Sequence, residues 1–215
     1  MEVNRKVKQV IDLYKITGWK RWFAKVRLWD APFEEIEKIA PKRGKIIDLG
    51  CGEGILSNYL ALVSNNRKIF GIEIDNYRIK DANRGLPNTE FRHGDVLKTA
   101  LPRGDVFLMV HLLHHLPSKE DQLKLLRKVK NSLPKKGKLI IAEVSTKPYI
   151  KYLISWLTDA FIVPILFEKK FYNLKFYYRN EREWKTLLKK IGFKVIVKPA
   201  HKGKPFSHII FIATK

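Results

Sequence analysis

Three glycines at alternate positions, Gly50, Gly52 and Gly54, directly follow a short apolar run and are the first feature of the chain with an evident chemical use. The run 45–49 is rich in aliphatic residues and predicts a buried strand, and the apolar segment 55–63 predicts a helix. Glycines at this density let the backbone turn sharply and let a ligand approach the main chain. A strand, a glycine turn and a helix form the nucleotide site of open α/β sheets. The alternative is an ordinary strand-to-helix turn without a ligand.

The spacing of these glycines differs from that of dinucleotide-binding turns, which would require a small residue at Ile55. Residues 48–54, Asp-Leu-Gly-Cys-Gly-Glu-Gly, resemble the first motif of class I S-adenosylmethionine (SAM)-dependent methyltransferases. The resemblance implies that the loop runs under the amino-acid part of the donor and that Asp48 helps to order the loop and the donor's amino group. The implied loop residues are Gly50, Cys51, Gly52 and Gly54.

An acid at the end of the next expected strand, 67–75, suits a ribose, because a carboxylate can accept hydrogen bonds from both hydroxyls of the diol. In the resembled family this acid follows a glycine and an apolar residue, a pattern that Gly71-Ile72-Glu73 matches. The resemblance therefore implies that Glu73 is the ribose ligand. Asp75 is the alternative, and its structural role would be to cap the following helix.

The expected third strand and its exit turn, 89–96, end in a Gly-Asp-Val sequence. The resemblance implies that Asp95 accepts a hydrogen bond from the adenine amine and that Val96 packs against the ring. A turn stabilised by the aspartate side chain is the alternative for any Gly-Asp pair.

Three histidines, His111, His114 and His115, follow the expected fourth strand, 105–110. No metal site is expected, because few acids lie nearby in the sequence and Cys51 is the only cysteine. The segment 113–116, Leu-His-His-Leu, resembles one that many small-molecule methyltransferases carry here. This resemblance implies that His111 and Leu112 face the donor. The pKa of histidine lies near neutrality, so His111 and His114 are the candidate general bases.

Two other subfamilies lack support in the sequence. Amino-group DNA methylases carry an Asn/Asp-Pro-Pro-aromatic motif after this strand, and the chain has none. Carbon-5 pyrimidine methylases need a nucleophilic cysteine, whereas Cys51 lies in the glycine loop.

The elements that must position these residues alternate between strand and helix, which is typical of a parallel α/β sheet. The family implies a doubly wound, seven-stranded, mostly parallel sheet of order 3-2-1-4-5-7-6, with strand 7 antiparallel and helices on both faces. The remaining elements are expected as helices at 32–40, 78–84, 119–133 and 181–191 and strands at 138–144, 193–197 and 206–213. His208 begins the last strand and is expected to be structural.

The expected domains are an N-terminal helical cover, 1–40, and the SAM-binding domain, 41–215, with a helical lid at 146–178. The cover either shields the donor or acceptor or packs against the sheet edge, and its Trp/Arg interleaving could also bind nucleic acid. The aromatic lid favours an acceptor site. Added core and a membrane-surface helix that delivers a lipid-like acceptor are the alternatives.

Lysine and arginine number 43 against 21 aspartates and glutamates, a net charge of +22, which favours an anionic partner such as RNA or a membrane surface. A cytoplasmic location is expected from the single cysteine and from the absence of an apolar segment after the basic residues 5–8, with peripheral membrane attachment as the alternative. The apolar run 152–167 is too interrupted to predict a membrane span.

Together these features predict a SAM-dependent methyltransferase that acts on a small-molecule or lipid-like acceptor and releases S-adenosylhomocysteine. Two alternatives stay open. An RNA methyltransferase is favoured by the charge alone, and a non-catalytic SAM-binding protein is favoured by the absence of an evident catalytic residue.

Overall fold

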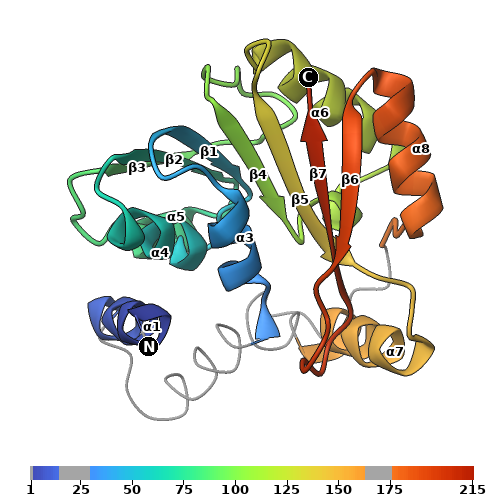
Figure 1. Ribbon diagram of the computed structural model, residues 1–215, viewed down its shortest axis with the longest axis horizontal. Coiled ribbons are helices and arrows are strands. Elements are labelled where there is room, and N and C mark those ends of the chain that lie inside the picture. Colours follow the sequence, from blue (N-terminus) through green and yellow to red (C-terminus); the bar gives the residue numbers. More distant parts are fainter. Residues whose placement is uncertain (1, 15–29, 163–175) are drawn as a thin grey trace.

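A computed structural model describes residues 2–14, 30–162 and 176–215. Within them, seven strands form one sheet of order β3-β2-β1-β4-β5-β7-β6 (Figure 1). The first five strands are mutually parallel, and β7 runs antiparallel to both of its neighbours, which confirms the expected fold. The strands are β1 (Gly44–Leu49), β2 (Arg67–Glu73), β3 (Thr89–His93), β4 (Val106–Val110), β5 (Lys138–Val144), β6 (Lys194–Pro199) and β7 (His208–Thr214).

Helices cover both faces of this sheet, because side chains of a strand alternate between its faces. In β1, Ile46 packs into one core with the first helices, whereas Ile47 packs into a second core with α6 and α8. Both isoleucines are fully buried, as expected for a central strand. The helices are α1 (Glu2–Leu13), α3 (Phe33–Ile39), α4 (Ile55–Val63), α5 (Asn76–Ala82), α6 (Lys119–Ser132), α7 (Tyr149–Leu157) and α8 (Glu181–Ile191), with the short turns η1 (Leu113–His115) and η2 (Thr158–Ile162).

Local sequence signals explain several of the helix boundaries. Asn180 caps α8 in a reciprocal arrangement with Glu183, and Gly192 ends that helix in the left-handed conformation. Helix α5 begins at Asn76, two residues before the predicted start, because the Asp75 carboxylate accepts from two backbone N–H groups of its first turn. The structural role predicted for Asp75 is therefore confirmed.

The additions to the sheet lie where its parallel strands end. Figure 1 shows α7 beyond the carboxyl ends of β4 and β5, and α1 beside α4. The Trp/Arg interleaving at 19–29 and the charged and aromatic part of the lid at 163–175 lie outside the described residues. No helix of the described ranges is both long and apolar enough to cross a membrane.

Candidate active site

The glycine turn between β1 and α4 requires three left-handed residues. Gly50, Gly52 and Gly54 have φ angles of 68°, 55° and 71°, a region that side chains rarely adopt. A Cβ on Gly50 would lie 2.7 Å from Leu112 Cδ1, and one on Gly54 would lie 2.8 Å from Ala82 Cβ, so both glycines also permit close packing. A Cβ on Gly52 would meet no atom within 4 Å, although Gly52 itself is buried. The turn therefore has a hollow at its middle glycine.

Asp48 and Cys51 shape this turn from inside the protein. The Asp48 carboxylate is buried and accepts a 2.6 Å hydrogen bond from the Ser57 hydroxyl on α4. Burial raises the pKa of Asp48 to about 7. Burial also raises the pKa of the Cys51 thiol, whose sulfur packs beside Gly71, so Cys51 is poorly suited to be a nucleophile. The Asp48 side chain therefore links the two ends of the turn, and Cys51 contributes its backbone to the turn.

Glu73 lies at the end of β2 and connects two loops. Its Oε2 accepts from the Gly52 amide at 2.8 Å, and its Oε1 accepts from the Ile74 and Asp75 amides at 2.9 and 3.0 Å. An ionised carboxylate offers about four acceptor positions, so a position remains for a ligand hydroxyl. The structure thus gives Glu73 a role in holding the turn, and its role as ribose ligand stays a prediction.

Asp95 lies after β3, next to the loop that carries Glu73. The Gly94 amide donates to the Glu73 backbone carbonyl at 2.8 Å, which brings the two loops together. The Asp95 carboxylate accepts from the Leu97 amide at 2.9 Å, so the alternative turn role is present. Val96 is buried in the core. Both predicted acids therefore meet at one edge of the sheet, beside the glycine turn.

The N-terminal segment reaches the same turn. The Tyr14 hydroxyl donates to the Glu53 carbonyl at 2.5 Å and accepts from the Asn58 side chain at 2.7 Å. Arg84 lies 4.3 Å from the centre of the Tyr14 ring. The residue that follows α1 thus contacts the turn directly, a contact that suits the predicted cover.

The histidine segment leaves β4 in a strained conformation. His111 has a φ of 52°, the only positive value outside glycine among the described residues, and its amide donates to the Ala142 carbonyl at 2.8 Å. The next residue, Leu112, packs against Gly50. Residues 113–115 then form η1, which places His114 two residues beyond the contact with the glycine turn.

His114 is fully buried between two carboxylates. Its Nδ1 lies 2.5 Å from Glu143 Oε2, and the other oxygen of Glu143 accepts from the Leu113 amide at 2.8 Å. Its Nε2 has no hydrogen-bond partner and lies 3.6 Å from Asp159 Oδ2. Burial lowers the pKa of His114, but the charges of Glu143 and Asp159 outweigh it and raise this pKa above its usual value.

The expectation that few acids lie near the histidines was therefore wrong. It rested on sequence distance, whereas β5 supplies Glu143 and η2 supplies Asp159. His114, His115 and Asp159 each offer a ligand atom within 4.8 Å of the others, but the Tyr178 hydroxyl also donates to that Asp159 carboxylate at 2.8 Å. The contacts form a chain of hydrogen-bonding groups around His114, and none of them indicates a metal.

Aromatic rings surround the His114 imidazole. Tyr178 stacks on it, with ring centres 4.9 Å apart and 18° between the planes, and Phe176 and Tyr152 contact Tyr178. The Gln122 side chain fixes the last residues of the predicted lid, because it donates to the carbonyls of Leu113 and Tyr177 at 3.0 and 2.7 Å. The base candidate therefore lies in an aromatic shell that is anchored to the sheet.

Four site residues, Glu143, Asp159, Tyr178 and Asp30, were missed by sequence reasoning. Glu143 is the only acid in an apolar strand, and Asp159 is the only acid in the apolar run 152–167. A lone acid in an apolar segment is a sequence signal that could have identified both residues. His208, predicted to be structural, is buried and its Nε2 lies 2.8 Å from Asp30 Oδ2. No sequence pattern indicated the role of Tyr178 or the pairing of Asp30 with His208.

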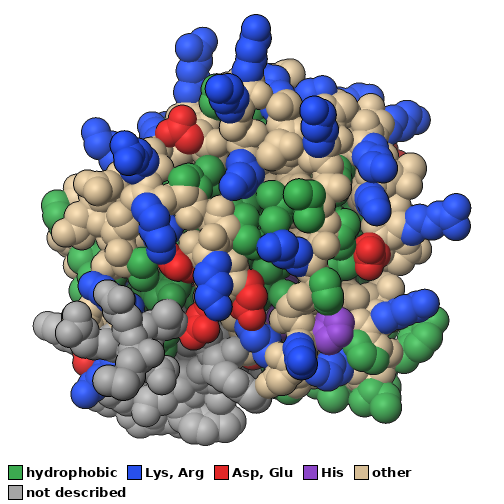
Figure 2. All heavy atoms as spheres, viewed as in Figure 1, with side chains coloured by type: hydrophobic (Ala, Val, Ile, Leu, Met, Phe, Trp, Pro, Cys, Tyr) green, Lys and Arg blue, Asp and Glu red, His purple; other side chains and the backbone are tan. Residues whose placement is uncertain are grey.

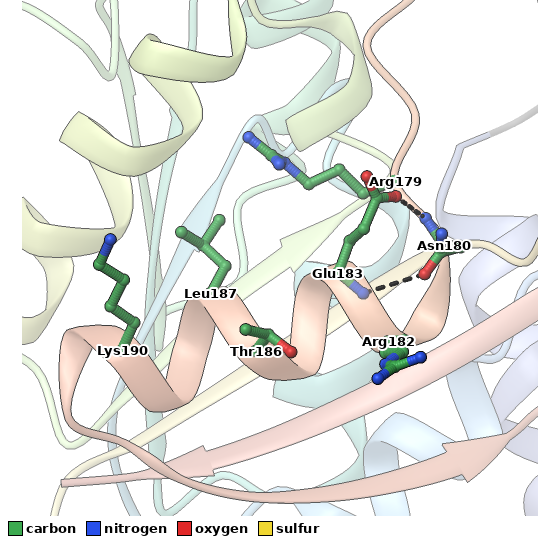
Figure 3. A pocket seen from close by; sticks show the side chains of 7 residues that line it. All are labelled: Arg179, Asn180, Arg182, Glu183, Thr186, Leu187 and Lys190. Carbon is green, nitrogen blue, oxygen red and sulfur yellow. Dashed lines mark hydrogen bonds between the residues drawn. The ribbon is translucent and has the colours of Figure 1, made fainter.

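A surface hollow lies along one side of α8, from the residues before its first turn to its last turn (Figure 3). Its walls include Leu187 and the cap residues Asn180 and Glu183, whose hydrogen bonds to each other serve the helix end. None of the predicted site residues lines it.

Comparison with known proteins finds relatives in sequence and in structure. The sequence profile of a family described as "Methyltransferase domain" matches residues 15–198. O-methyltransferase 10 of Lophophora williamsii is 30% identical over 155 residues, which cover 69% of this chain but only 37% of that protein. The chain thus spans well under half of that relative's length.

Two solved structures share the fold at low sequence identity. A SAM-dependent methyltransferase of Methanosarcina mazei aligns with a TM-score of 0.64 and 20% identity, covering 84% of this chain and 96% of that one. Human N-acetylserotonin methyltransferase, solved in complex with SAM, aligns with a TM-score of 0.68 and 16% identity, covering 99% of this chain and 57% of that one.

Proposed function

The chain belongs to the class I SAM-dependent methyltransferase family, and from this premise we propose that it transfers a methyl group to the hydroxyl of a small aromatic molecule, with His114 as general base. One observation carries the proposal. A buried histidine, oriented by Glu143, follows two residues after Leu112, which packs against Gly50 of the glycine turn. The nitrogen that would accept a proton thus lies on the segment that adjoins the donor loop.

The described residues fit the donor. The hollow at Gly52 provides backbone approach for its amino-acid part, and Glu73 and Asp95 lie on adjacent loops where a ribose and an adenine would extend from it. In this proposal Gly50, Cys51 and Gly54 complete the turn, Asp48 braces it, and Val96, His111 and Leu112 border the donor. When bound, SAM supplies a methyl group activated by a sulfonium charge, so the protein needs only to position and deprotonate the acceptor.

Glu143 sets the tautomer of His114. Its Oε2 accepts from Nδ1–H, so Nε2 carries the free lone pair and can take the proton of the acceptor hydroxyl. Because Glu143 also accepts from the Leu113 amide, the ring and the backbone of η1 are fixed together. Asp159, 3.6 Å from Nε2, stabilises the imidazolium that results.

The aromatic shell of Tyr178, Phe176 and Tyr152 supports a flat apolar acceptor, and the O-methyltransferase relative supports a hydroxyl as the methylated group. An RNA acceptor rests on charge alone. Figure 2 shows Lys and Arg side chains spread over the visible face rather than gathered in one area.

Two measurements test the proposal. Calorimetric titration should show SAM and S-adenosylhomocysteine binding at one site. Incubation of the protein with methyl-labelled SAM and separate lipid, metabolite and RNA fractions of cells should place the label in small aromatic molecules. Label in the RNA fraction would refute the proposed acceptor class and indicate an RNA methyltransferase. Donor binding without any label transfer would indicate a non-catalytic SAM-binding protein.

The pH dependence of the reaction should report His114. We expect kcat/KM to rise with pH through a midpoint above 6.5, the usual pKa of histidine, because the base must be neutral and its pKa is raised. Asp159→Asn removes one of the two charges that raise this pKa and should shift the midpoint to lower pH. The control, Asp81→Asn on the exposed side of α5, should leave the midpoint unchanged. A midpoint that Asp159→Asn does not move would exclude His114 as the titrating base.

A further inference from the structure

Helix α7 and the η2 turn expose an apolar face that the described protein leaves uncovered. Six of the nine large hydrophobic side chains exposed in the described residues lie on this short segment. They form two adjacent rows with a spacing of four residues and so share one side of the helix. They are Tyr149, Ile150, Leu153, Ile154, Leu157 and Phe161, with exposed fractions of 73, 76, 54, 41, 43 and 42%. We call this set the α7 face.

The opposite side of α7 is fixed to the protein. Ser155 is buried and its hydroxyl accepts from the Ser207 amide at 3.2 Å, and the Lys151 ammonium donates to the His201 carbonyl at 2.9 Å. These contacts bind the helix to the loop between β6 and β7. The orientation of the α7 face toward the outside is therefore set by polar contacts behind it.

Lysines outnumber acids around the α7 face, although Lys204 pairs with Glu35 and Lys151 lies behind the helix. Segments 145–162 and 198–207 together carry five lysines and one acid, Asp159. That acid points inward, toward His114 and Tyr178. Lys147 and Lys202 are exposed. Figure 2 shows green apolar side chains with blue ones beside them at the lower right, where Figure 1 places α7.

We propose that the α7 face docks on an anionic lipid surface, with the lysines at its border contacting the phosphate groups. An amphipathic helix with a basic border lies in the plane of a membrane interface, and its apolar side chains enter the boundary of the acyl region. The 14 residues of α7 and η2 extend only about 21 Å, which is too short to cross a bilayer. Charge complementarity favours this partner over a second copy of the chain, which would bring a second basic border to the same place.

Docking would also place the active site at the membrane. Helix α7 runs directly into η2, whose Asp159 faces His114. The acceptor would then be an amphiphile dissolved in the bilayer, a consequence that rests on the proposed function. The docking itself does not require it.

Co-sedimentation with vesicles tests the docking. Wild-type protein should bind vesicles that contain about one third phosphatidylglycerol, bind phosphatidylcholine vesicles at least about tenfold more weakly, and lose binding as salt is raised. The affinity of the double variant Leu153→Gln/Leu157→Gln for the anionic vesicles should be lower by at least about tenfold. Its matched control, Tyr77→Gln/Ile196→Gln, removes exposed apolar side chains from α5 and β6 and should bind as the wild type does.

A second pair of variants tests the charges. Lys147→Gln/Lys202→Gln should weaken binding by roughly 25-fold, about fivefold for each lysine. Lys124→Gln/Lys189→Gln makes the same change in net charge on α6 and α8 and should not weaken it. Circular dichroism and titration with SAM verify that each variant is folded, so a failure of docking is distinguished from a failure of the proposed function.

Three results would overturn the proposal. They are no binding at low salt, equal binding to neutral and anionic vesicles, and wild-type binding by Leu153→Gln/Leu157→Gln. A dimer in light scattering that this double variant dissociates would assign the α7 face to a second copy instead.

Discussion

Replacement of His114 by asparagine should lower the rate of methyl transfer by about 10²- to 10⁴-fold and leave the affinity for S-adenosylhomocysteine unchanged. The imidazole Nε2 is buried without a hydrogen-bond partner, on the one ring of the described site that lies between two carboxylates. Asparagine can still hydrogen-bond to Glu143 but cannot accept a proton near neutral pH. The measurements are single-turnover transfer from labelled SAM and calorimetry with the product.

His115→Asn is the control, because His115 is the next residue and is exposed, whereas the Glu143 carboxylate bonds to His114 and Leu113; the rate of this variant should stay within about threefold of wild type. The loss in His114→Asn should diminish as pH rises, because hydroxide can then deprotonate the acceptor, whereas a loss of folding would not respond in this way. If the asparagine itself unfolds the site, His114→Asn/Glu143→Gln removes the buried charge and restores a neutral pair. Transfer at the wild-type rate in either folded variant would refute a general base at this position.

Replacement of Gly52 by leucine should weaken SAM binding by about 100-fold, equivalent to about 2.8 kcal/mol. The middle glycine is buried, yet a Cβ there would point into open space, so a side chain would fill the hollow proposed for the donor. The change also places a side chain at a φ of 55°, which costs about 1–2 kcal/mol of folding stability. Calorimetric titration measures the first effect, and urea unfolding measures the second.

Gly203→Leu is a matched control. Gly203 lies in the loop between β6 and β7, has a φ of 72°, and a Cβ there would likewise meet no atom within 4 Å. Both variants should lose similar stability, but Gly203→Leu should bind SAM as the wild type does. Equal SAM affinities in the two folded variants would show that the glycine turn does not hold the donor.

The proposed donor half of the site could be predicted from the sequence because its residues lie in short contiguous motifs. The glycines of 48–54 and the acids Glu73 and Asp95 each follow a strand, and parallel strands bring their carboxyl ends to one edge of the sheet. The capping role of Asp75 and the boundaries of α8 were equally local. Such features depend on backbone conformation and on neighbours a few residues away, so their spacing identifies them.

The proposed acceptor half of the site depends on contacts that no sequence spacing reveals. Glu143 is 29 residues from His114, Tyr178 is 19 residues from Asp159, and Asp30 is 178 residues from His208. The order of the sheet was implied by the family resemblance that the sequence motifs carry, and the sequence offered His111 and His114 as equal candidates. Only the tertiary structure distinguished them, because the electrostatic environment of a buried imidazole is set by carboxylates that the fold brings from β5 and η2.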